Sequence, residues 1–269
     1  MSEHLVHTSS NQFPLILGHR GSSAIAPENT MIAFKNAQAD GADGIEFDVQ
    51  LARDGVPVVI HDPTLNRTGG LMKRVDQFSS KELNQIDVGS WFNRRFPGKA
   101  KAWFSNATVP TLKEVFDTFK NQNFQLYVEM KCDKGEDYKA LASAVVQSIR
   151  EAGTNEQIVV ESFELAAIEE LKRIAPEICT AALFEPKFLR LVRTKRRLIE
   201  QAIARGANEI ALHHTLATRM TVKMASESGL KTVIWTTDNP IWVGRASRYG
   251  IKAIITNNPA LLLDQRGKG

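Results

Sequence analysis

The chain has 269 residues, of which 43% are hydrophobic and 24% are charged, a composition typical of a globular protein with a large buried core. This composition excludes a mainly disordered chain, and the two cysteines, Cys132 and Cys179, are too few for a disulfide framework. The net charge of +4 is a mild basic excess that suits phosphate-bearing ligands but is more typical of a solvated basic surface.

The beginning of the chain carries no targeting signal. Residues 1–13 lack the charged start and the apolar core of a secretory signal, and no apolar run of 18 residues occurs in the sequence. We expect a flexible N-terminal arm, a cytoplasmic protein with free thiols, no stable membrane insertion and no nucleic-acid partner.

Short apolar runs alternate with longer amphipathic stretches, as in repeated strand–helix units. The expected strands begin at Leu15, Ile45, Phe124, Ile158, Ile178, Glu209, Lys231 and Ala253. Eight alternating units fit a (β/α)8 TIM barrel better than an open sheet, and a barrel of this kind commonly forms one domain. We therefore expect a single α/β barrel domain over residues 14–266.

A hairpin and an insertion interrupt the repeat after the second strand. Asp54-Gly55 lies between two extended runs, which is a strong hairpin signal. Residues 63–109 then break the rhythm, with a capping box at Ser79 and Glu82 that opens a short helix. We expect a small inserted subdomain here. Its aromatic residues form either a wall over a site or the core of the subdomain: Trp91, Phe92, Phe96, Trp103 and Phe104.

A basic amphipathic stretch runs from Lys187 to Arg205. Such a stretch can bind a membrane surface or nucleic acid. No aromatic residues interleave its basic face, which favours an ordinary barrel helix with one packed and one solvated face.

Carboxylates share one face of an apolar strand. Residues two apart in a strand point the same way, so Glu46 and Asp48 lie together, and Glu129 and Lys131 repeat this spacing on the next barrel strand. Two carboxylates about 4 Å apart repel by roughly 4 kcal/mol at an effective dielectric constant of about 20. Raised pKa values, the cations Lys131 and Arg20, or a divalent cation such as Mg²⁺ or Ca²⁺ would neutralise them. A salt-bridge network at the rim is the structural alternative.

Two histidines, His19 and His61, stand where a strand meets its loop. Near neutral pH one histidine can accept a proton while the other donates one. Arg20 offers a two-pronged donor for phosphate oxygens, and Lys131 offers a compact second charge. These groups predict metal-assisted cleavage of a phosphodiester. An enolising or aldol-type barrel enzyme would use some of them but would not require two histidines.

A series of short motifs runs through the chain in order. They are His19-Arg20-Gly21, Ala26-Pro27-Glu28-Asn29-Thr30, Glu46-Phe47-Asp48-Val49, Asp54-Gly55, His61-Asp62, Leu65-Asn66-Arg67-Thr68, Gly89-Ser90-Trp91-Phe92, Val109-Pro110-Thr111-Leu112, Glu129-Met130-Lys131, Ser162-Phe163 and Ile254-Ile255-Thr256. With these motifs the chain resembles the glycerophosphodiester phosphodiesterase family over about residues 14–263. So many motifs in one order make the resemblance specific.

The resemblance implies a TIM barrel with an inserted subdomain. It also implies hydrolysis of glycerophosphodiesters, such as deacylated phospholipids, to glycerol 3-phosphate and an alcohol, an activity of lipid and glycerol metabolism. The roles that it implies are acid/base catalysis for His19 and His61, divalent-cation binding for Glu46, Asp48 and Glu129, and phosphate binding for Arg20 and Lys131. Trp235 would wall the glycerol side or only pack, and Glu28 would hold a site residue or only cap a helix.

The sequence departs from the family pattern at Cys132, where proline is frequent, and at Asn257, where an acid commonly follows Ile254-Ile255-Thr256. We expect these departures to change loop detail or substrate preference without loss of activity. Two other functions stay open, a lysophospholipase D-like activity on single-chain lipids and a silent phosphate-binding protein on the same fold. The sequence does not decide the headgroup, the native cation, the oligomeric state, or whether water or the glycerol hydroxyl attacks.

Overall fold

Eight parallel strands close into a barrel in the computed structural model, which describes residues 13–132, 137–153, 155–187 and 194–268. The barrel strands are β1 (Leu15–His19), β2 (Gly44–Leu51), β4 (Gln125–Met130), β5 (Ile158–Ser162), β6 (Cys179–Phe184), β7 (Glu209–His213), β8 (Lys231–Trp235) and β9 (Ala253–Thr256). Parallel pairing of β1 with both β2 and β9 completes the closure. The expected (β/α)8 barrel is confirmed, and the strand starts agree with the expected ones to within one residue.

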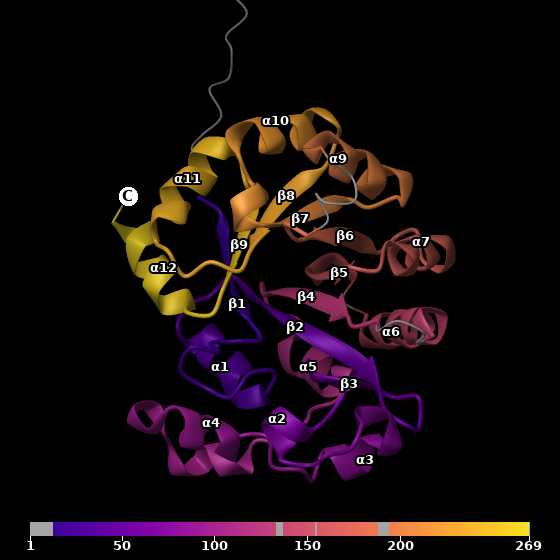
Figure 1. Cartoon of the computed structure of the whole chain (residues 1–269), viewed down its shortest axis with the longest axis vertical. Helices are drawn as coiled ribbons and strands as arrows, with labels where there is room; N and C mark the ends of the chain where they lie inside the picture. The colour runs from indigo at the N-terminus through magenta and orange to yellow at the C-terminus, as the bar shows by residue number, and fades with distance from the viewer. Residues whose placement is uncertain (1–12, 133–136, 154, 188–193, 269) are drawn as a thin grey trace, which may run out of the picture.

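Helices surround the barrel, as Figure 1 shows. In the described part of the chain they are α1 (Met31–Ala39), α5 (Leu112–Phe119), α6 (Tyr138–Ala152), α7 (Leu165–Ile174), α9 (Lys195–Ala204), α10 (Arg219–Glu227), α11 (Ile241–Tyr249) and α12 (Pro259–Gly267). Each one follows a barrel strand in the chain, and the last, α12, packs against β1 and α11 (Figure 1).

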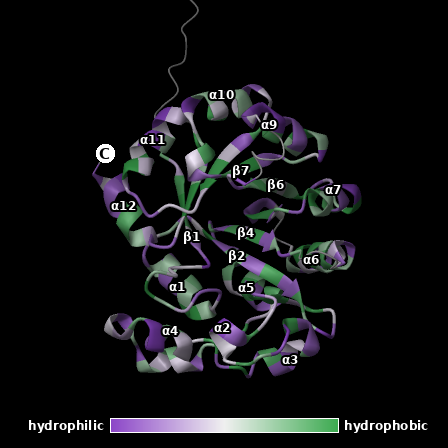
Figure 2. Cartoon of the chain, viewed as in Figure 1, coloured by the Kyte–Doolittle hydropathy of each residue, from purple (hydrophilic) through white to green (hydrophobic). Residues whose placement is uncertain are grey.

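Alternation along β2 separates the core from the site. Ile45, Phe47 and Val49 pack outward in a cluster that includes Phe34 of α1 and Phe116 of α5. The residues between them face the barrel interior, as the spacing predicts. Green and purple therefore alternate along the helices in Figure 2, because each helix buries only one stripe against the strands.

The expected hairpin joins β2 to a short strand, β3 (Pro57–Val59). These two strands pair antiparallel, with Val49 opposite Val59. Gly55 in the connecting turn has φ +75°, a left-handed conformation that glycine adopts without a steric cost.

Short helices fill the segment between β3 and α5, and they lie below α1 and α5 in Figure 1. They are α2 (Asn66–Gly69), η1 (Val75–Gln77), α3 (Ser80–Leu83), α4 (Ser90–Arg95), η2 (Pro97–Lys99) and η3 (Ala102–Asn106). The capping box of Ser79 and Glu82 opens α3, as expected.

The aromatic residues of this segment divide between two environments. Phe92 and Phe104 are buried against Ala26 and Ala33, so they attach the segment to the start of the barrel. In contrast, Trp103 is 57% exposed and Phe96 is 38% exposed. The core reading therefore describes Phe92 and Phe104.

The basic stretch forms α9 where it is described, and residues 188–193 lie outside the described residues. Leu198, Ile199 and Ala202 are buried, as an ordinary barrel helix requires. Ile203 also has an apolar side chain but is exposed, since it lies in the last turn of α9, outside the packed stripe. Of residues 1–13, expected as a flexible arm, residues 1–12 also lie outside the described part. Among the described residues, no helix combines the length and apolarity needed to cross a bilayer.

Candidate active site

The tight turn after β1 sets the position of His19 and Arg20. Arg20 adopts φ +53°, and its backbone N–H donates to the Glu46 carbonyl at 2.7 Å. Gly21 follows with φ +82°, and a Cβ there would lie 2.5 Å from the backbone carbonyl carbon of Ala33. The turn therefore needs a glycine, because α1 packs directly against it. A non-glycine residue in a left-handed conformation is frequent at functional sites.

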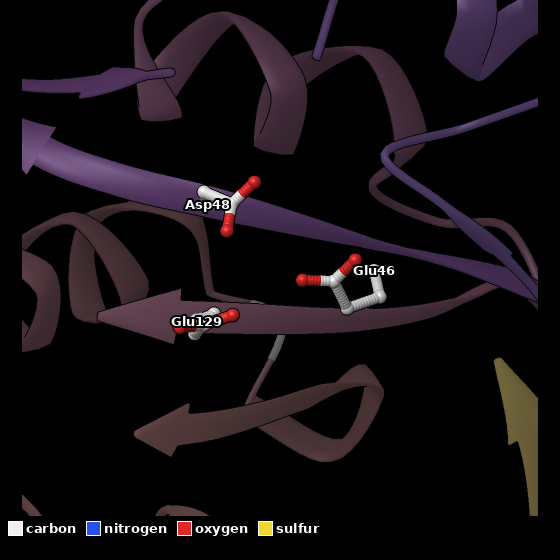
Figure 3. A group of neighbouring side chains, drawn as sticks. All are labelled: Glu46, Asp48 and Glu129. Atoms are coloured by element: carbon white, nitrogen blue, oxygen red, sulfur yellow. The ribbon is translucent and has the colours of Figure 1, made fainter. Parts of the chain in front are cut away.

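Three carboxylates converge inside the C-terminal end of the barrel, Glu46 and Asp48 from β2 and Glu129 from β4. Figure 3 shows their carboxyl groups around one shared space, and their ligand atoms lie within 4.8 Å of one another. The parallel register places Asp48 directly opposite Glu129. All three are buried, with Asp48 fully enclosed.

Cationic side chains border this cluster on both sides. The Arg20 Nε lies 3.0 Å from Asp48 Oδ2, while Lys131 Nζ lies 2.8 Å from Glu129 Oε1 and 3.4 Å from Asp48 Oδ1. Asn29 also donates to Asp48 Oδ2 at 2.7 Å. Asp48 thus forms ion pairs with both cationic side chains, whereas the charge of Glu46 is compensated less.

The pKa values reflect this unequal compensation. Burial acts to raise the pKa of Asp48, but Arg20 and Lys131 outweigh burial and lower it. Burial, and then the charge of Asp48, raise the pKa of Glu129 to about 7. The same two causes raise the pKa of Glu46 well above its ordinary value. Two cations are therefore too few to stabilise three ionised carboxylates here.

The donor set fits a hard divalent cation. It consists of carboxylate oxygens, which Mg²⁺ and Ca²⁺ prefer. In addition, Asp48 Oδ1 is buried and accepts no hydrogen bond from a described residue. Lys131 Nζ, at 3.4 Å, is a charged neighbour of this oxygen but does not hydrogen-bond to it, so a bound cation would supply the closer charge that a buried carboxylate oxygen requires. The cluster could therefore hold a metal ion.

The orientation of His19 is fixed by Asn257. The Nδ1 atom of His19 lies 2.7 Å from the side-chain oxygen of Asn257, whose amide nitrogen donates to Asp238 at 3.0 Å. Since Asp238 fixes which end of the amide is the donor, we assign the proton of His19 to Nδ1. Its Nε2 then faces the cluster, 3.8 Å from Glu46 Oε2. Burial, and then Arg20, lower the pKa of His19 to about 4.

A carboxylate orients His61 in the same way. The Nδ1 atom of His61 lies 2.7 Å from Asp62 Oδ1, and Arg67 Nε donates to Asp62 Oδ2 at 2.6 Å. The hydrogen bond from His61 lowers the pKa of Asp62, and Arg67 lowers it further. An ionised Asp62 accepts the Nδ1 proton, so His61 also presents its Nε2 to the site.

Glu28 connects the two loops that carry these histidines. It accepts hydrogen bonds from Arg20 Nη1 at 2.7 Å and from both terminal nitrogens of Arg67 at 2.8 Å. The N-cap of α1 is Thr30, so Glu28 does not cap that helix. Of the two roles considered for Glu28, its contacts therefore match the one in which it holds site residues in place.

Most of the predicted residues meet in one cavity of about 430 Å³. Seven of the nine line it, and they are His19, Arg20, Glu46, His61, Glu129, Lys131 and Trp235. Asp48 lies beneath its surface, and Glu28 lies behind Arg20. Trp235 donates to the Ala211 carbonyl at 3.1 Å and packs edge-to-face on Phe163 at 5.3 Å, so it is packed and also lines the cavity.

Sequence reasoning missed four residues of this arrangement. Asp62 and Arg67 stood within quoted motifs without a role, and Asn257 was noted only as a departure. The fourth, Glu161, precedes Ser162-Phe163 and also lines the cavity. Burial, and then Glu129, raise the pKa of Glu161 well above its usual range. Its place at the end of the expected strand that begins at Ile158 was the available signal, because the carboxyl ends of barrel strands carry the site.

Comparisons with known proteins agree with this geometry. The model of the glycerophosphoryl diester phosphodiesterase family matches residues 19–261. A protein of Caldanaerobacter subterraneus subsp. tengcongensis named glycerophosphodiester phosphodiesterase is 31% identical, over 95% of this chain and 98% of that protein. A crystal structure of a putative glycerophosphoryl diester phosphodiesterase from Silicibacter pomeroyi has a TM-score of 0.82 at 28% identity, with 94% of each chain covered. An Oleispira antarctica phosphodiesterase, solved with the product sn-glycerol-3-phosphate, has a TM-score of 0.81 over 95% of this chain and 97% of that chain, and its 24% identity shows the fold alone.

Proposed function

We propose, from the premise that the chain belongs to the glycerophosphoryl diester phosphodiesterase family, that it hydrolyses glycerophosphodiesters to glycerol 3-phosphate and an alcohol. One observation carries the proposal. Two oriented histidines and two cationic side chains surround a buried carboxylate cluster in a single cavity. We also propose a cytoplasmic setting, supported by the absence of a disulfide between Cys132 and Cys179.

Glu46, Asp48 and Glu129 would hold a divalent cation, Mg²⁺ or Ca²⁺. When bound, this cation polarises a phosphoryl oxygen and stabilises the negative charge that develops there. Its charge would also offset the burial and the repulsion from Asp48 that raise the pKa values of Glu46 and Glu129.

Arg20 and Lys131 would bind the oxygens of the scissile phosphate. Glu28 and Asp48 occupy the Nη1 and Nε sides of the Arg20 guanidinium, which leaves Nη2 to donate to a ligand. Lys131 is held between Glu129 and Asp48, so its ammonium is already in place before the substrate binds. Preorganised donors of this kind stabilise charge without a cost of reorientation during the reaction.

His19 would act as the base and His61 as the acid. The acceptor for His19 is a neutral amide, whereas the acceptor for His61 is the carboxylate of Asp62. A neutral partner favours an uncharged imidazole, which takes the proton from the attacking oxygen through Nε2. A carboxylate partner stabilises an imidazolium, which gives its proton to the oxygen of the departing alcohol. If water attacks, these transfers release glycerol 3-phosphate directly. If the glycerol hydroxyl attacks, they release the alcohol and a cyclic phosphate, which water then opens to glycerol 3-phosphate in a second step.

Trp235 and Phe163 would form an apolar wall for the carbon atoms of the glycerol group. Their edge-to-face contact and the hydrogen bond from Trp235 to Ala211 keep this wall rigid. Phe163 also lies 6.0 Å below the ammonium of Lys131, so the wall stands beside the proposed phosphate position.

The test is a panel of glycerophosphodiesters assayed for released glycerol 3-phosphate. We expect turnover of glycerophosphocholine, with lysophosphatidylcholine cleaved poorly if at all. Preference for lysophosphatidylcholine would indicate the lysophospholipase D-like activity instead. Binding of glycerol 3-phosphate without turnover of any diester would indicate a silent phosphate-binding protein.

A further inference from the structure

A second hollow, open to solvent, lies beside the catalytic cavity. It is bordered by α4 and η2 and by the loops after β1, β8 and β9, and its volume is about 790 Å³. Two hydrogen-bonded pairs form the wall between the two spaces. In each pair one residue lines the cavity and the other lines the hollow, His19 with Asn257 and Arg20 with Glu28.

The lining of this hollow is strongly basic. It includes Arg67, Arg94, Arg95 and Lys99. The sequence has no acidic residue between Asp87 and Glu114, so this part of the chain contributes only positive charge. Neither Arg94 nor Arg95 forms an ion pair with a described residue, and both are exposed.

The two acidic residues at the hollow are already engaged. Glu28 accepts hydrogen bonds from Arg20 and Arg67, and Asp238 accepts hydrogen bonds from Thr256 and Asn257. Their charges therefore do not compensate Arg94 and Arg95. Asp87 interacts with the charge of Arg94 but forms no ion pair with it. Exposed guanidinium groups without an ion-paired carboxylate are suited to binding phosphate or carboxylate oxygens in a two-pronged geometry.

The basic residues lie on a rigid support. Buried Phe92 fixes α4 against Phe104, and Asn93 exchanges two hydrogen bonds with the backbone of Lys101, at 2.8 and 3.0 Å. Lys99 donates to the Ala24 carbonyl at 2.7 Å. This contact ties the basic segment to the loop that carries His19 and Arg20. The arginines are thus held next to the site and are not part of a separate surface.

Arg67 connects the hollow to the leaving-group side of the site. It lines the hollow, and it also donates to Asp62, which orients the proposed acid His61. The proposed glycerol wall, Phe163 and Trp235, lines the catalytic cavity and not the hollow, so the alcohol part of the substrate is the part that can extend toward the hollow.

We propose that this basic hollow binds a second anionic group on the alcohol part of the substrate. The preferred substrates are then glycerophosphodiesters whose alcohol carries a phosphate or carboxylate group, ahead of those with a cationic alcohol such as choline. This inference rests on the proposed phosphodiesterase function. A positive potential at the hollow would also accelerate the encounter with such substrates at low ionic strength.

The test compares two soluble substrates in two double variants. The substrates are glycerophosphocholine and 1,3-bis(glycerophospho)glycerol, whose alcohol carries a second phosphate. The variant Arg94→Gln/Arg95→Gln removes two charges from the hollow. The matched control Lys231→Gln/Arg248→Gln removes two exposed charges at the start of β8 and the end of α11, at the opposite end of the barrel.

We expect the first variant to lose about tenfold in kcat/KM on the bis-phosphate substrate, the effect of roughly 1.4 kcal/mol, with glycerophosphocholine turnover unchanged. The control variant should match the parent on both substrates. Equal losses on both substrates, or no loss on either, would overturn the inference while leaving the phosphodiesterase function intact. If the parent cleaves neither substrate, both proposals are wrong.

A second measurement separates substrate from lipid as the source of the anion. The parent and the first variant are sedimented with phosphatidylglycerol vesicles. Vesicle binding that the variant loses, without any change in its kinetics on the soluble substrates, would assign the hollow to a membrane surface and contradict the inference.

Discussion

The side-chain oxygen of Asn257 lies 2.7 Å from Nδ1 of His19, although 238 positions separate the two residues in the chain. Asp238 orients the Asn257 amide from the other side. The loops after β1, β8 and β9 thus combine to leave Nε2 of His19 as the atom that can accept a proton. A position that the sequence marked only as a family departure controls the proposed base.

Replacing Asn257 by aspartate should change the pH dependence of turnover. A carboxylate next to His19 favours its imidazolium, whose pKa burial and Arg20 otherwise lower to about 4. Because the proposed base must be neutral, the acidic limb of the kcat profile should move to higher pH, by about one unit. Profiles of kcat against pH for both proteins provide the measurement. Superimposable acidic limbs would argue against the assignment of His19 as the base.

Asn257→Leu is the matched variant without an acceptor. It leaves the Nδ1 proton of His19 unpaired, and comparable losses of orienting partners cost about 10 to 100-fold in activity. Thermal denaturation of both variants controls for a change in folding.

Removing either histidine should abolish turnover and leave the fold intact. Both side chains stand at the rim of the barrel and line the cavity, so His19→Ala and His61→Ala create no hole in the hydrophobic core. General acid or base catalysis contributes about 10² to 10⁴-fold, which sets the expected loss of kcat. Steady-state kinetics and circular dichroism measure both quantities. Parent-like turnover in one variant would remove that histidine from the mechanism.

The faces of the strands could be predicted from the sequence, whereas the contacts between loops could not. Alternation places Glu46 and Asp48 inside and Phe47 outside, whatever the rest of the chain does. Glu129 joins them because parallel strands end at the same edge of the barrel.

The contacts of Asn257 with His19 and of Arg67 with Glu28 join loops that only barrel closure brings together. No local pattern encodes such contacts. The aromatic residues of the insertion show a similar limit. Phe92 and Trp103 stand in one stretch of similar composition, and only the packing of Phe92 against Ala26 and Ala33 makes one buried and the other exposed.

Arg67 should matter for catalysis without a role in binding the scissile phosphate. It holds Asp62 and Glu28 together, so Arg67→Met would release the partners of both His61 and Arg20. We expect kcat on glycerophosphocholine to fall about tenfold, with a smaller change in KM. Partial recovery of kcat when millimolar guanidinium is added would confirm that the guanidinium group of Arg67 acts by holding Asp62 and Glu28 in place. An unchanged kcat would show that Asp62 and Glu28 do not need this bridge.

Gly21→Ala should destabilise the fold far more than Gly55→Ala. Both glycines have positive φ, but a Cβ at position 21 would meet the backbone of Ala33 at 2.5 Å, whereas a Cβ at position 55 has nothing within 4 Å. The conformation alone costs about 1 kcal/mol, and the backbone overlap adds a further cost of about 1 to 3 kcal/mol at position 21 only. Urea denaturation gives both free energies of unfolding. Equal losses would mean that α1 can move away from the β1 turn without cost.

The carboxylate cluster provides the most direct test of the proposed mechanism. The protein is treated with a chelator and dialysed, and glycerol 3-phosphate release from glycerophosphocholine is measured before and after Mg²⁺ or Ca²⁺ is added. We predict no release without the cation, recovery with one of the two, and a higher cation requirement in Glu129→Gln, because Glu129 is one of the three carboxylates around the shared space. Full activity of the metal-free protein would contradict the account.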